Sequence, residues 1–303
     1  GILCDDMGLG KTLQALCVLS AAAHERRQQK GASAQGASAL PSLVVCPPTL
    51  TGHWIAEAAK FCPGTLSTLE YAGNAAARQK LQAHIASAEL VVMSYDSLRA
   101  DIGQLASVRW DYVVLDEGHG IRNAKAKVSI AAKRLRSARR LILSGTPLQN
   151  HAVELWSLFD FLMPNYLGSQ AHFQRTYARP IHAALGARAG DATHLEGEAA
   201  LARLHRQVLP FCLRRTKESV LSELPAKLME DRTCELHPVQ RALYAAFEAS
   251  RAPDALAQAV GKAAAGTEGA AQGGGSGVAA TGGGKGAATH VFAALQYLRR
   301  VCN

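Results

Sequence analysis

The stretch DDMGLGKT, residues 5–12, decides the fold of this 303-residue chain. It carries two glycines before a lysine and a threonine, the composition of a loop that binds phosphate at the start of a helix. The glycines let backbone N–H groups close on phosphate oxygens, while Lys11 offers a positive charge and Thr12 a hydroxyl for Mg²⁺. The strict pattern G-x-x-x-x-G-K-[ST] requires glycine where Asp5 stands, so the stretch alone also fits an ordinary strand-to-helix turn.

An acidic pair, Asp116 and Glu117, provides the second chemical signal. The stretch YVVLDEGH places both carboxylates directly after an apolar strand, where a parallel α/β sheet presents its ligand-facing edge. We expect Asp116 to hold Mg²⁺ through a water molecule and Glu117 to polarise the attacking water. The competing interpretation is an acidic pair that merely begins a loop.

The stretch LILSGTPLQN provides the third signal, an apolar strand that ends in small and polar residues. Such a tip is suited to sense a γ-phosphate or to couple it to a neighbouring polymer, although a plain β-turn is the competing interpretation. Three loops of this kind in order on one sheet rarely arise by chance. Together they predict an ATP site with Lys11, Asp116 and Glu117 as its catalytic residues.

The remaining candidate residues of the ATP site fall into three groups. The expected nucleotide-binding residues are Asp6, Met7, Gly8, Leu9, Gly10, Lys11 and Thr12. The expected Mg²⁺ ligands are Thr12 and Asp116. The expected coupling residues are Ser144, Gly145, Thr146, Gln149 and Asn150. ATP and Mg²⁺ are therefore the expected cofactors.

Short apolar runs that alternate with longer helical patterns predict an α/β fold with a mostly parallel sheet. The expected strands cover residues 43–46, 68–71, 90–94, 112–115 and 141–144. A helix is expected to begin at the phosphate loop, and a helical insertion is expected after the SGTP loop. The predicted organisation is an ATP-binding core over residues 1–150, a helical insertion and return segment over 151–251, a low-complexity, disordered insertion over 252–289 and a final helix over 290–303.

Composition limits the classes of partner and compartment. With 48% hydrophobic residues the chain can bury one good core or two modest ones, and its net charge of +9 favours a polyanionic partner. Charge alone does not choose between DNA, RNA and an acidic protein. Seven widely spaced cysteines without a Cys-x-x-Cys pair suit reduced thiols in an intracellular protein. No apolar run approaches the roughly 20 residues that cross a bilayer, so no membrane partner is expected.

The set of motifs resembles the SWI/SNF-type ATPases of helicase superfamily two. Their first loop runs Asp-x-Met-Gly-Leu-Gly-Lys-Thr, so Asp5 is the residue that the family uses there. The resemblance extends through VVCPPTLTGHW, VVMSYDSLR, DEGHGIRNAKAK, LSGTPLQN, ELWSLFDFLMP and LPFCLRRTKESVLSELPAKL. The wording PPTLTGHW, the glycine of DEGH where most relatives have alanine, and the closing VFAALQYLRRVCN are most similar to the branch that removes TATA-box-binding protein from promoters.

The resemblance implies a RecA-like P-loop lobe that contacts double-stranded DNA. It assigns five residues to loops that face one DNA strand: Pro47, Thr49, Leu50, Ser94 and Tyr95. Hydroxyl and backbone N–H groups at strand ends suit phosphate contacts, which give affinity without sequence choice. Trp54 is expected to pack in the core.

Two groups of basic residues have two interpretations each. The basic stretch between residues 122 and 140 is expected to form a solvated helix face, with DNA contact as the alternative. Arg214, Arg215 and Lys217 resemble the segment that leads toward the second lobe of the family, so we expect them to couple the lobes or to bind.

The expected function is that of the ATP-binding lobe of a nuclear DNA-dependent ATPase, a double-stranded DNA translocase that displaces bound protein. In the resembled branch that protein is TATA-box-binding protein, contacted through regions outside this chain. Because the chain opens on GILCDDMGLGKT and shows no second set of helicase motifs, we expect a fragment with little turnover of its own. The alternatives are a strand-separating helicase and a nucleotide-binding fragment without turnover.

Overall fold

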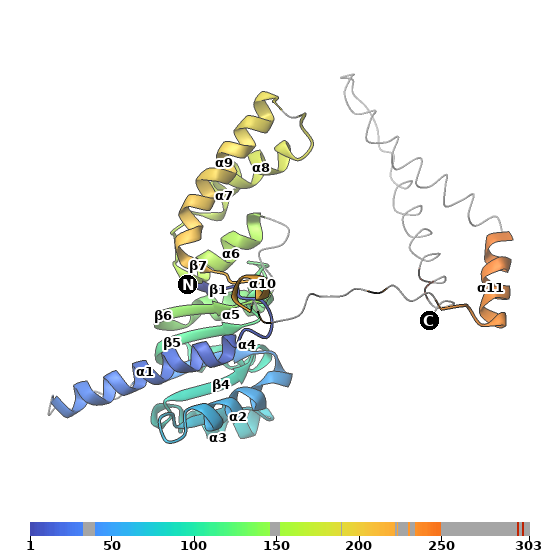
Figure 1. Cartoon of the computed structure of the whole chain (residues 1–303). Helices are drawn as coiled ribbons and strands as arrows, with labels where there is room; N and C mark the ends of the chain where they lie inside the picture. The colour runs from blue at the N-terminus through green and yellow to red at the C-terminus, as the bar shows by residue number, and fades with distance from the viewer. Residues whose placement is uncertain are drawn as a thin grey trace, which may run out of the picture. The chain divides into compact units, whose positions relative to one another are not determined.

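A parallel sheet of seven strands forms the centre of the structure (Figure 1). The computed structural model describes residues 1–32, 40–145, 152–188, 190–221, 223, 230, 234–249, 296 and 299. Within them the strands lie in the order β3 (Thr68–Tyr71), β4 (Leu90–Ser94), β2 (Ser42–Cys46), β5 (Arg109–Asp116), β6 (Arg136–Leu143), β1 (Ile2–Leu3) and β7 (Cys212–Leu213). All neighbouring strands in this sheet pair in parallel, which confirms the predicted α/β class.

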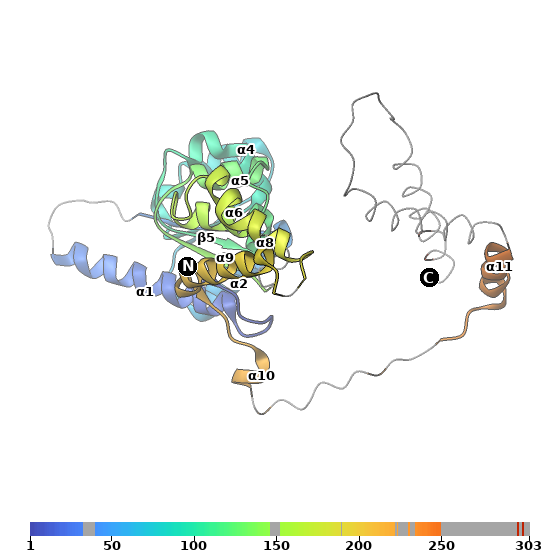
Figure 2. The ribbon, with the colours of Figure 1, turned by 90° about the horizontal axis from the view of Figure 1, so that it is seen from above.

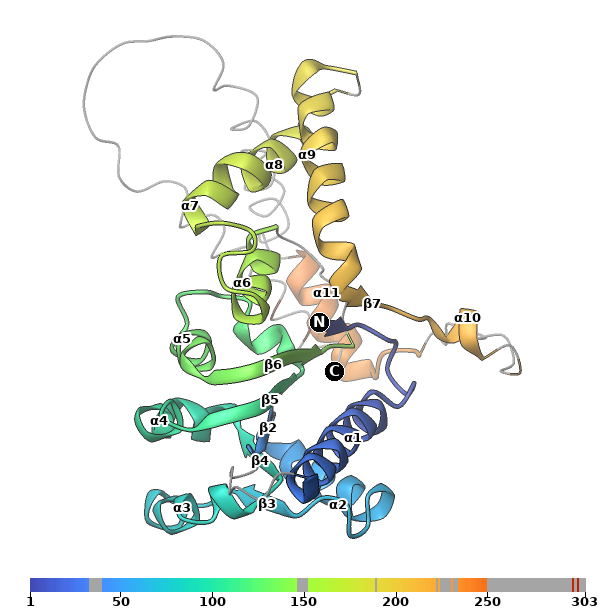
Figure 3. The same ribbon diagram turned by 90° about the vertical axis from the view of Figure 1, so that its left-hand side faces the viewer.

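Helices cover both faces of the sheet. In the first part of the chain they are α1 (Lys11–Ala32), α2 (Thr51–Phe61), α3 (Ala75–Gln82), α4 (Tyr95–Leu105), α5 (Lys127–Arg134), α6 (Ala152–Leu162), α7 (Gln170–Phe173), α8 (Arg179–Ala184), α9 (Ala192–Val208) and α10 (Lys217–Val220). Helices α1 and α2 lie on one face, and α3, α4 and α5 lie on the other (Figure 3). Helix α1 begins at the phosphate loop, as the sequence predicts.

Strand β2 shows how the sequence produces these two layers. All five of its residues are buried, as expected for a strand that is covered on both faces. Because side chains alternate along a strand, Leu43 and Val45 join the core beneath α4 and α5, whereas Val44 and Cys46 join the core beneath α1 and α2. The continuous apolar run of β2 therefore contributes side chains to both cores.

Helices α6 to α9 form an extension after β6, which confirms the predicted helical insertion. Helices α8 and α9 lie side by side (Figures 1 and 2). A Cβ atom on Gly197 of α9 would overlap with the side chain of Ala184 and would come within 2.7 Å of the Pro180 carbonyl oxygen. The absence of a side chain at Gly197 therefore allows the two helices to approach closely.

Strand β6 begins earlier than the expected range of 141–144. Arg136, Arg139 and Arg140 lie on this strand, so the interpretation of the basic stretch as a helix face is wrong for them. Their half of β6 pairs with the start of β5, where long side chains reach solvent or buried acceptors. The Arg139 guanidinium, for example, lies 2.7 Å from the carboxylate of Asp111. Strands β1 and β7, two residues each, were not predicted.

The chain divides into two units, Gly1–Leu224 and Pro225–Asn303. The first contains the sheet and helices α1 to α10, and the described part of the second consists mainly of α11 (Pro238–Ala249). The finer boundaries drawn from the sequence stay predictions. The low-complexity stretch 252–289 lies outside the described residues, and within 290–303 only Gln296 and Arg299 are described, both helical.

Candidate active site

The phosphate loop connects β1 to α1 at the carboxyl edge of the sheet. Gly8 and Gly10 have φ angles of 90° and 74°, a region that residues with a Cβ atom rarely adopt. Helix α1 begins at Lys11, and the first N–H groups of a helix have no acceptor within it. These amides stand at the positive end of the helix dipole, so the loop can receive an anion.

Lys11 lies inside this loop. Its Nζ donates hydrogen bonds to the backbone oxygens of Asp5 at 2.8 Å and Asp6 at 3.3 Å. A Cβ atom on Gly145, in the loop that follows β6, would lie 3.6 Å from the same Nζ and 2.9 Å from Met7 Cγ. The first and third sequence signals are therefore adjacent in space. Thr146, Gln149 and Asn150 lie outside the described residues.

Asp116 ends β5 and is 9% exposed. Its Oδ2 accepts a hydrogen bond from Trp54 Nε1 at 2.9 Å, and its Oδ1 accepts one from the Glu117 backbone N–H at 3.0 Å. Burial raises the pKa of this carboxyl above its ordinary value, and the bond from Trp54 opposes the shift only in part. Nearby Lys11 also favours the charged form. Asp116 is thus a desolvated carboxylate that gains from a cation beside it.

Glu117 adopts a left-handed backbone conformation, with φ 51° and ψ 52°. Its Oε2 lies 3.1 Å from His119 Nδ1, so the side chain has a polar neighbour two residues further on. The loop that carries it is pressed against β6, because a Cβ atom on Gly118 would overlap with Ile142 Cγ2. Non-glycine residues in this conformation cluster at functional sites, where the surrounding structure offsets their strain.

The expected DNA-facing residues lie at the same edge of the sheet. Pro47, Thr49 and Leu50 lie in the turn between β2 and α2, and Thr49 is exposed. Ser94 ends β4 and caps α4, where its Oγ accepts a hydrogen bond from the Ser97 N–H at 3.1 Å. The Tyr95 hydroxyl donates to the backbone oxygen of Asp116 at 2.7 Å. The structure thus gives Ser94 and Tyr95 contacts within the chain that the sequence did not indicate.

Sequence reasoning missed three side-chain contacts that hold the site. Trp54 packs in the core as expected and is fully buried, but its bond to Asp116 was not foreseen. Tyr95 contacts the same aspartate from another helix. Arg215 forms an ion pair with Asp5 across 210 positions of sequence. The sequence does not reveal these contacts, because an indole N–H or a hydroxyl group can donate to many acceptors. The acceptor is known only once the fold places the residues next to each other.

Half of the eight basic side chains between residues 122 and 140 have partners within the chain. Arg122 lies 3.5 Å from Glu154, and Lys133 lies 2.8 Å from Asp160. The Arg140 guanidinium donates to the backbone oxygens of Leu135 and Phe161. These contacts connect α5 and β6 to α6, so the stretch has a structural role whatever else it contacts.

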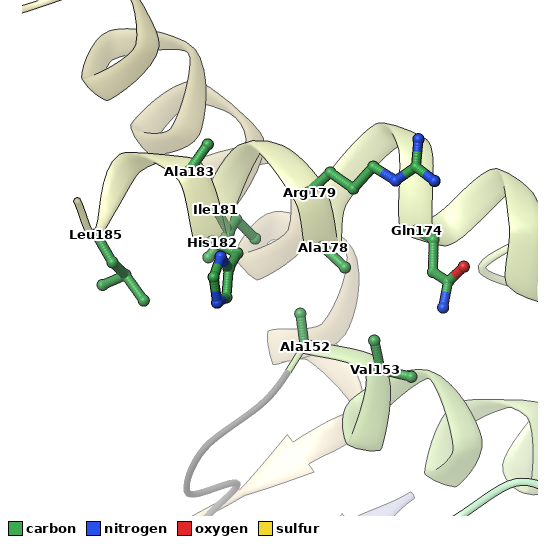
Figure 4. Close-up of a pocket in the computed structure, with 9 residues that line it drawn as sticks. All are labelled: Ala152, Val153, Gln174, Ala178, Arg179, Ile181, His182, Ala183 and Leu185. Atoms are coloured by element: carbon green, nitrogen blue, oxygen red, sulfur yellow. The ribbon is translucent and has the colours of Figure 1, made fainter. Parts of the chain in front are cut away.

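One cavity lies away from the strand ends that carry the candidate site. A cavity of about 480 Å³ opens between the start of α6 and the helical residues 174–185, lined mainly by apolar side chains with Gln174, Arg179 and His182 at its wall (Figure 4). None of the described residues that line it carries a carboxylate. Among the described residues no three His, Cys, Asp or Glu side chains gather as a metal site. In the same part of the chain, no helix has both the length and the apolar character that a bilayer crossing needs.

These features define a class of protein. A glycine-rich phosphate loop after β1, an acidic pair at the end of β5 and a small-residue loop after β6, all on one parallel sheet, are the layout of a RecA-like P-loop nucleotide-binding lobe. The chain belongs to the SNF2-related domain family, whose family model matches residues 1–303.

Relatives and solved structures agree with this assignment. TATA-binding protein-associated factor 172 of Homo sapiens is 48% identical over 100% of this chain and 16% of its own length, and MOT1 of Saccharomyces cerevisiae is 43% identical over 100% and 15%. The structure of the Sulfolobus solfataricus SWI2/SNF2 ATPase core in complex with dsDNA is similar with a TM-score of 0.61 and 29% identity, over 99% of this chain and 53% of that one. The chain thus spans about one sixth of these curated relatives.

Proposed function

We propose that this chain is the ATP-binding lobe of a DNA-dependent ATPase that moves along double-stranded DNA and displaces or remodels bound protein. The observation that carries the proposal is the meeting of three loops, those after β1, β5 and β6, at one edge of the parallel sheet. Family membership and the likeness to an ATPase core bound to dsDNA support it.

The phosphate loop would receive the β- and γ-phosphates. Residues Asp6 to Thr12 supply backbone N–H groups around two glycines in left-handed conformation, and Lys11 would exchange its carbonyl contacts for phosphate oxygens. A point charge that already lies in the loop loses little conformational freedom when it binds. The loop therefore fits a triphosphate in both charge and shape.

Thr12 and Asp116 would hold Mg²⁺. Hydroxyl and carboxylate oxygens are the ligands that this ion prefers, and each oxygen of Asp116 keeps a lone pair beyond the one hydrogen bond that it accepts. The raised pKa of the Asp116 carboxyl also fits, because a bound cation would offset the desolvation of its charge. The ion would neutralise charge on the phosphate oxygens.

Glu117 would polarise the water that attacks the γ-phosphate. Its carboxylate stands one residue beyond Asp116 and is half-buried, with His119 as a neighbour. The left-handed backbone turns the chain sharply after β5, so adjacent residues present their carboxylates in different directions. Ser144 and Gly145, with the residues that follow them, would couple the state of the phosphate to DNA.

Contact with DNA would come from the turn after β2 and from the start of α4. Thr49 carries the most accessible hydroxyl among the five candidates, whereas Ser94 and Tyr95 are engaged within the chain. Such contacts to phosphate groups would bind duplex DNA without sequence preference. The net charge of +9 would add long-range attraction.

The displaced protein is proposed to be TATA-box-binding protein, and the site of action the nucleus. Support comes from the relatives that cover the whole chain, which are named TATA-binding protein-associated factors. Choice of the displaced protein would reside in the parts of those longer proteins that this chain does not match. A strand-separating helicase is the rival function, and unwinding of a forked duplex would favour it.

The test compares ATP hydrolysis with and without duplex DNA. Because the solved ATPase core is about twice as long as the matching chain, residues 1–303 are joined to a second RecA-like lobe for this assay. DNA should stimulate turnover, and Glu117→Gln should lower kcat by about a hundredfold or more while ATP·Mg still binds. Glu25→Gln, an exposed carboxylate on α1, is the control and should change little. Undiminished turnover in Glu117→Gln would place the catalytic role elsewhere.

A further inference from the structure

Asp5 stands where the strict phosphate-loop pattern has glycine, and the structure shows what its side chain contacts. The residue is fully buried. Its Oδ1 accepts hydrogen bonds from the Arg215 backbone N–H at 2.9 Å and from Arg215 Nε at 3.2 Å. Its Oδ2 accepts from Arg215 Nε at 3.0 Å, from Gln14 Nε2 at 3.2 Å and from Arg215 Nη2. One carboxylate is thus bound mainly by one guanidinium from a distant part of the chain.

The backbone around Arg215 also follows the phosphate loop. Within the predicted return, residues 213–217 continue the pairing of β7 with β1, and the name return segment is kept for these five residues alone. The Cys4 N–H donates to the Leu213 oxygen at 2.7 Å, and the Asp6 N–H donates to the Arg215 oxygen at 3.1 Å. The Lys217 N–H donates to Asp6 Oδ2 at 3.1 Å. The return segment is therefore hydrogen-bonded along the first half of the phosphate loop.

The Arg215–Asp5 pair is connected to Lys11 of the phosphate loop through the backbone of Asp5. The backbone oxygen of Asp5 accepts the hydrogen bond from Lys11 Nζ at 2.8 Å. Any displacement of Asp5 therefore displaces the acceptor that holds the Lys11 ammonium group. The other end of the same network is Gln14 on α1, whose Nε2 also donates to the Leu9 oxygen at 2.9 Å. Both ends of the loop are tied to one buried carboxylate.

The charge state of Asp5 depends on this arrangement. Burial raises the pKa of the Asp5 carboxyl, but the hydrogen bonds from Arg215 and Gln14 outweigh burial and hold the pKa below its ordinary value. A buried carboxylate without such partners is strongly unfavourable, so removal of the guanidinium would force Asp5 to move, to take up a proton or to admit water. Each of these responses changes the loop.

We propose that Arg215 is a positioning residue for nucleotide binding, because it anchors Asp5 and thereby fixes the phosphate loop and the Lys11 ammonium group. The inference rests on the proposed function of that loop as an ATP site. It explains why an aspartate occupies the first position of the loop: the residue serves as the attachment point of the return segment. The same segment lies shortly before Leu224, where the first unit ends.

The experiment measures binding of a fluorescent ATP analogue with Mg²⁺ to residues 1–303. Arg215→Gln should weaken binding by about tenfold to a hundredfold, the range expected when a supporting contact of a binding group is lost. Arg215→Lys should be intermediate, because an ammonium group supplies charge but not the planar fork. Arg203→Gln is the control, since this arginine is exposed on α9, and should bind within about twofold of the unmodified chain.

Two further variants separate the possible failures. Lys11→Ala tests the proposed function: if it binds the analogue as the unmodified chain does, the loop is no nucleotide site. If Lys11→Ala loses binding while Arg215→Gln is folded by circular dichroism and keeps full affinity, the positioning role of Arg215 is refuted. Should Arg215→Gln fail to fold, Asp5→Asn with Arg215→Gln removes the buried charge as well. That double variant should fold and bind weakly, and full affinity in it would overturn the inference.

Discussion

Single residues at the end of β5 show how helices on both faces of the sheet support the acidic pair. Trp54 lies on α2, yet its indole N–H donates to the Asp116 carboxylate, while Tyr95 on α4 donates to the backbone oxygen of the same residue. Two helices on opposite faces of the sheet thus hold one aspartate. Trp54 lies one helical turn after Leu50, and Tyr95 is itself a candidate DNA-facing residue. A shift of either helix would therefore change the contacts of Asp116.

Replacement of Trp54 by phenylalanine tests this support. Trp54→Phe keeps an aromatic ring but leaves a buried carboxylate oxygen without its donor, which should cost about 1–3 kcal/mol of unfolding free energy. The measurement is urea unfolding at neutral pH. Trp110→Phe is the control, because that buried indole donates only a long bond of 3.4 Å to a backbone oxygen and should cost less. Equal losses in both variants would mean that ring volume alone matters.

Because the pKa of the Asp5 carboxyl is lowered in the folded chain, we expect the free energy of unfolding to depend on pH. Its pKa in the folded chain lies below the ordinary value of 3.8, so its stabilising contribution is complete above about pH 3.8 and is lost as the pH falls through the lower, folded value. The stability advantage of the unmodified chain over Asp5→Asn should therefore shrink at acid pH. Urea unfolding at several pH values measures it, with the exposed Asp96→Asn as control. A constant difference down to pH 2 would contradict the assignment.

At the scale of elements, the contact between the acidic loop and β6 limits which residues fit. Gly118 is buried, and a Cβ atom there would overlap with Ile142 Cγ2. Gly118→Ala should therefore destabilise the chain by about 1–3 kcal/mol through overpacking. Gly103→Ala is the matched comparison, because a Cβ atom at this exposed position of α4 would meet nothing within 4 Å. Gly103→Ala should raise the free energy of unfolding by about 0.5–1 kcal/mol. Thermal or urea unfolding measures both variants. If both substitutions changed the free energy in the same direction, the packing of Gly118 against Ile142 would be contradicted.

The elements also show what the sequence could and could not predict. Strands β2 and β4 were found because buried parallel strands are continuous apolar runs. Strands β1 and β7, with two residues each, are too short to show a pattern, and the basic start of β6 resembled a helix surface. The three loops of the site were predicted because their motifs are local. The Arg215–Asp5 pair was not, because nothing local in either residue identifies a partner 210 positions away.

At the scale of the whole molecule, charge and length set the expected behaviour of residues 1–303. The net charge of +9 and the phosphate-facing loops should give weak binding to duplex DNA without sequence preference. If about four phosphates are neutralised, affinity should fall by about a hundredfold between 50 and 200 mM salt. Fluorescence anisotropy with two unrelated duplexes measures both properties. Thr49→Ala should weaken binding to the two duplexes equally, and a salt-independent affinity would contradict a phosphate-based contact.

Turnover by residues 1–303 alone should stay close to background even with DNA. The chain matches 53% of the solved ATPase core, and phosphoryl transfer is fast when an arginine, often supplied by another domain, stabilises charge in the transition state. A coupled assay for released phosphate measures it. Strong DNA-stimulated hydrolysis by residues 1–303 would require a stabilising residue within the first lobe that the structure does not identify among its described residues.

The most direct test of the central claim is calorimetric titration of residues 1–303 with ATP and Mg²⁺, for the unmodified chain and for Lys11→Ala. The unmodified protein should bind ATP at one site per chain. Lys11→Ala should lose at least about a hundredfold in affinity, because Lys11 supplies the principal positive charge to the β- and γ-phosphates. The melting temperatures of the two proteins without nucleotide should be close. Equal affinity for ATP in both proteins would show that the loop after β1 is only a turn, and the proposed function would fall with it.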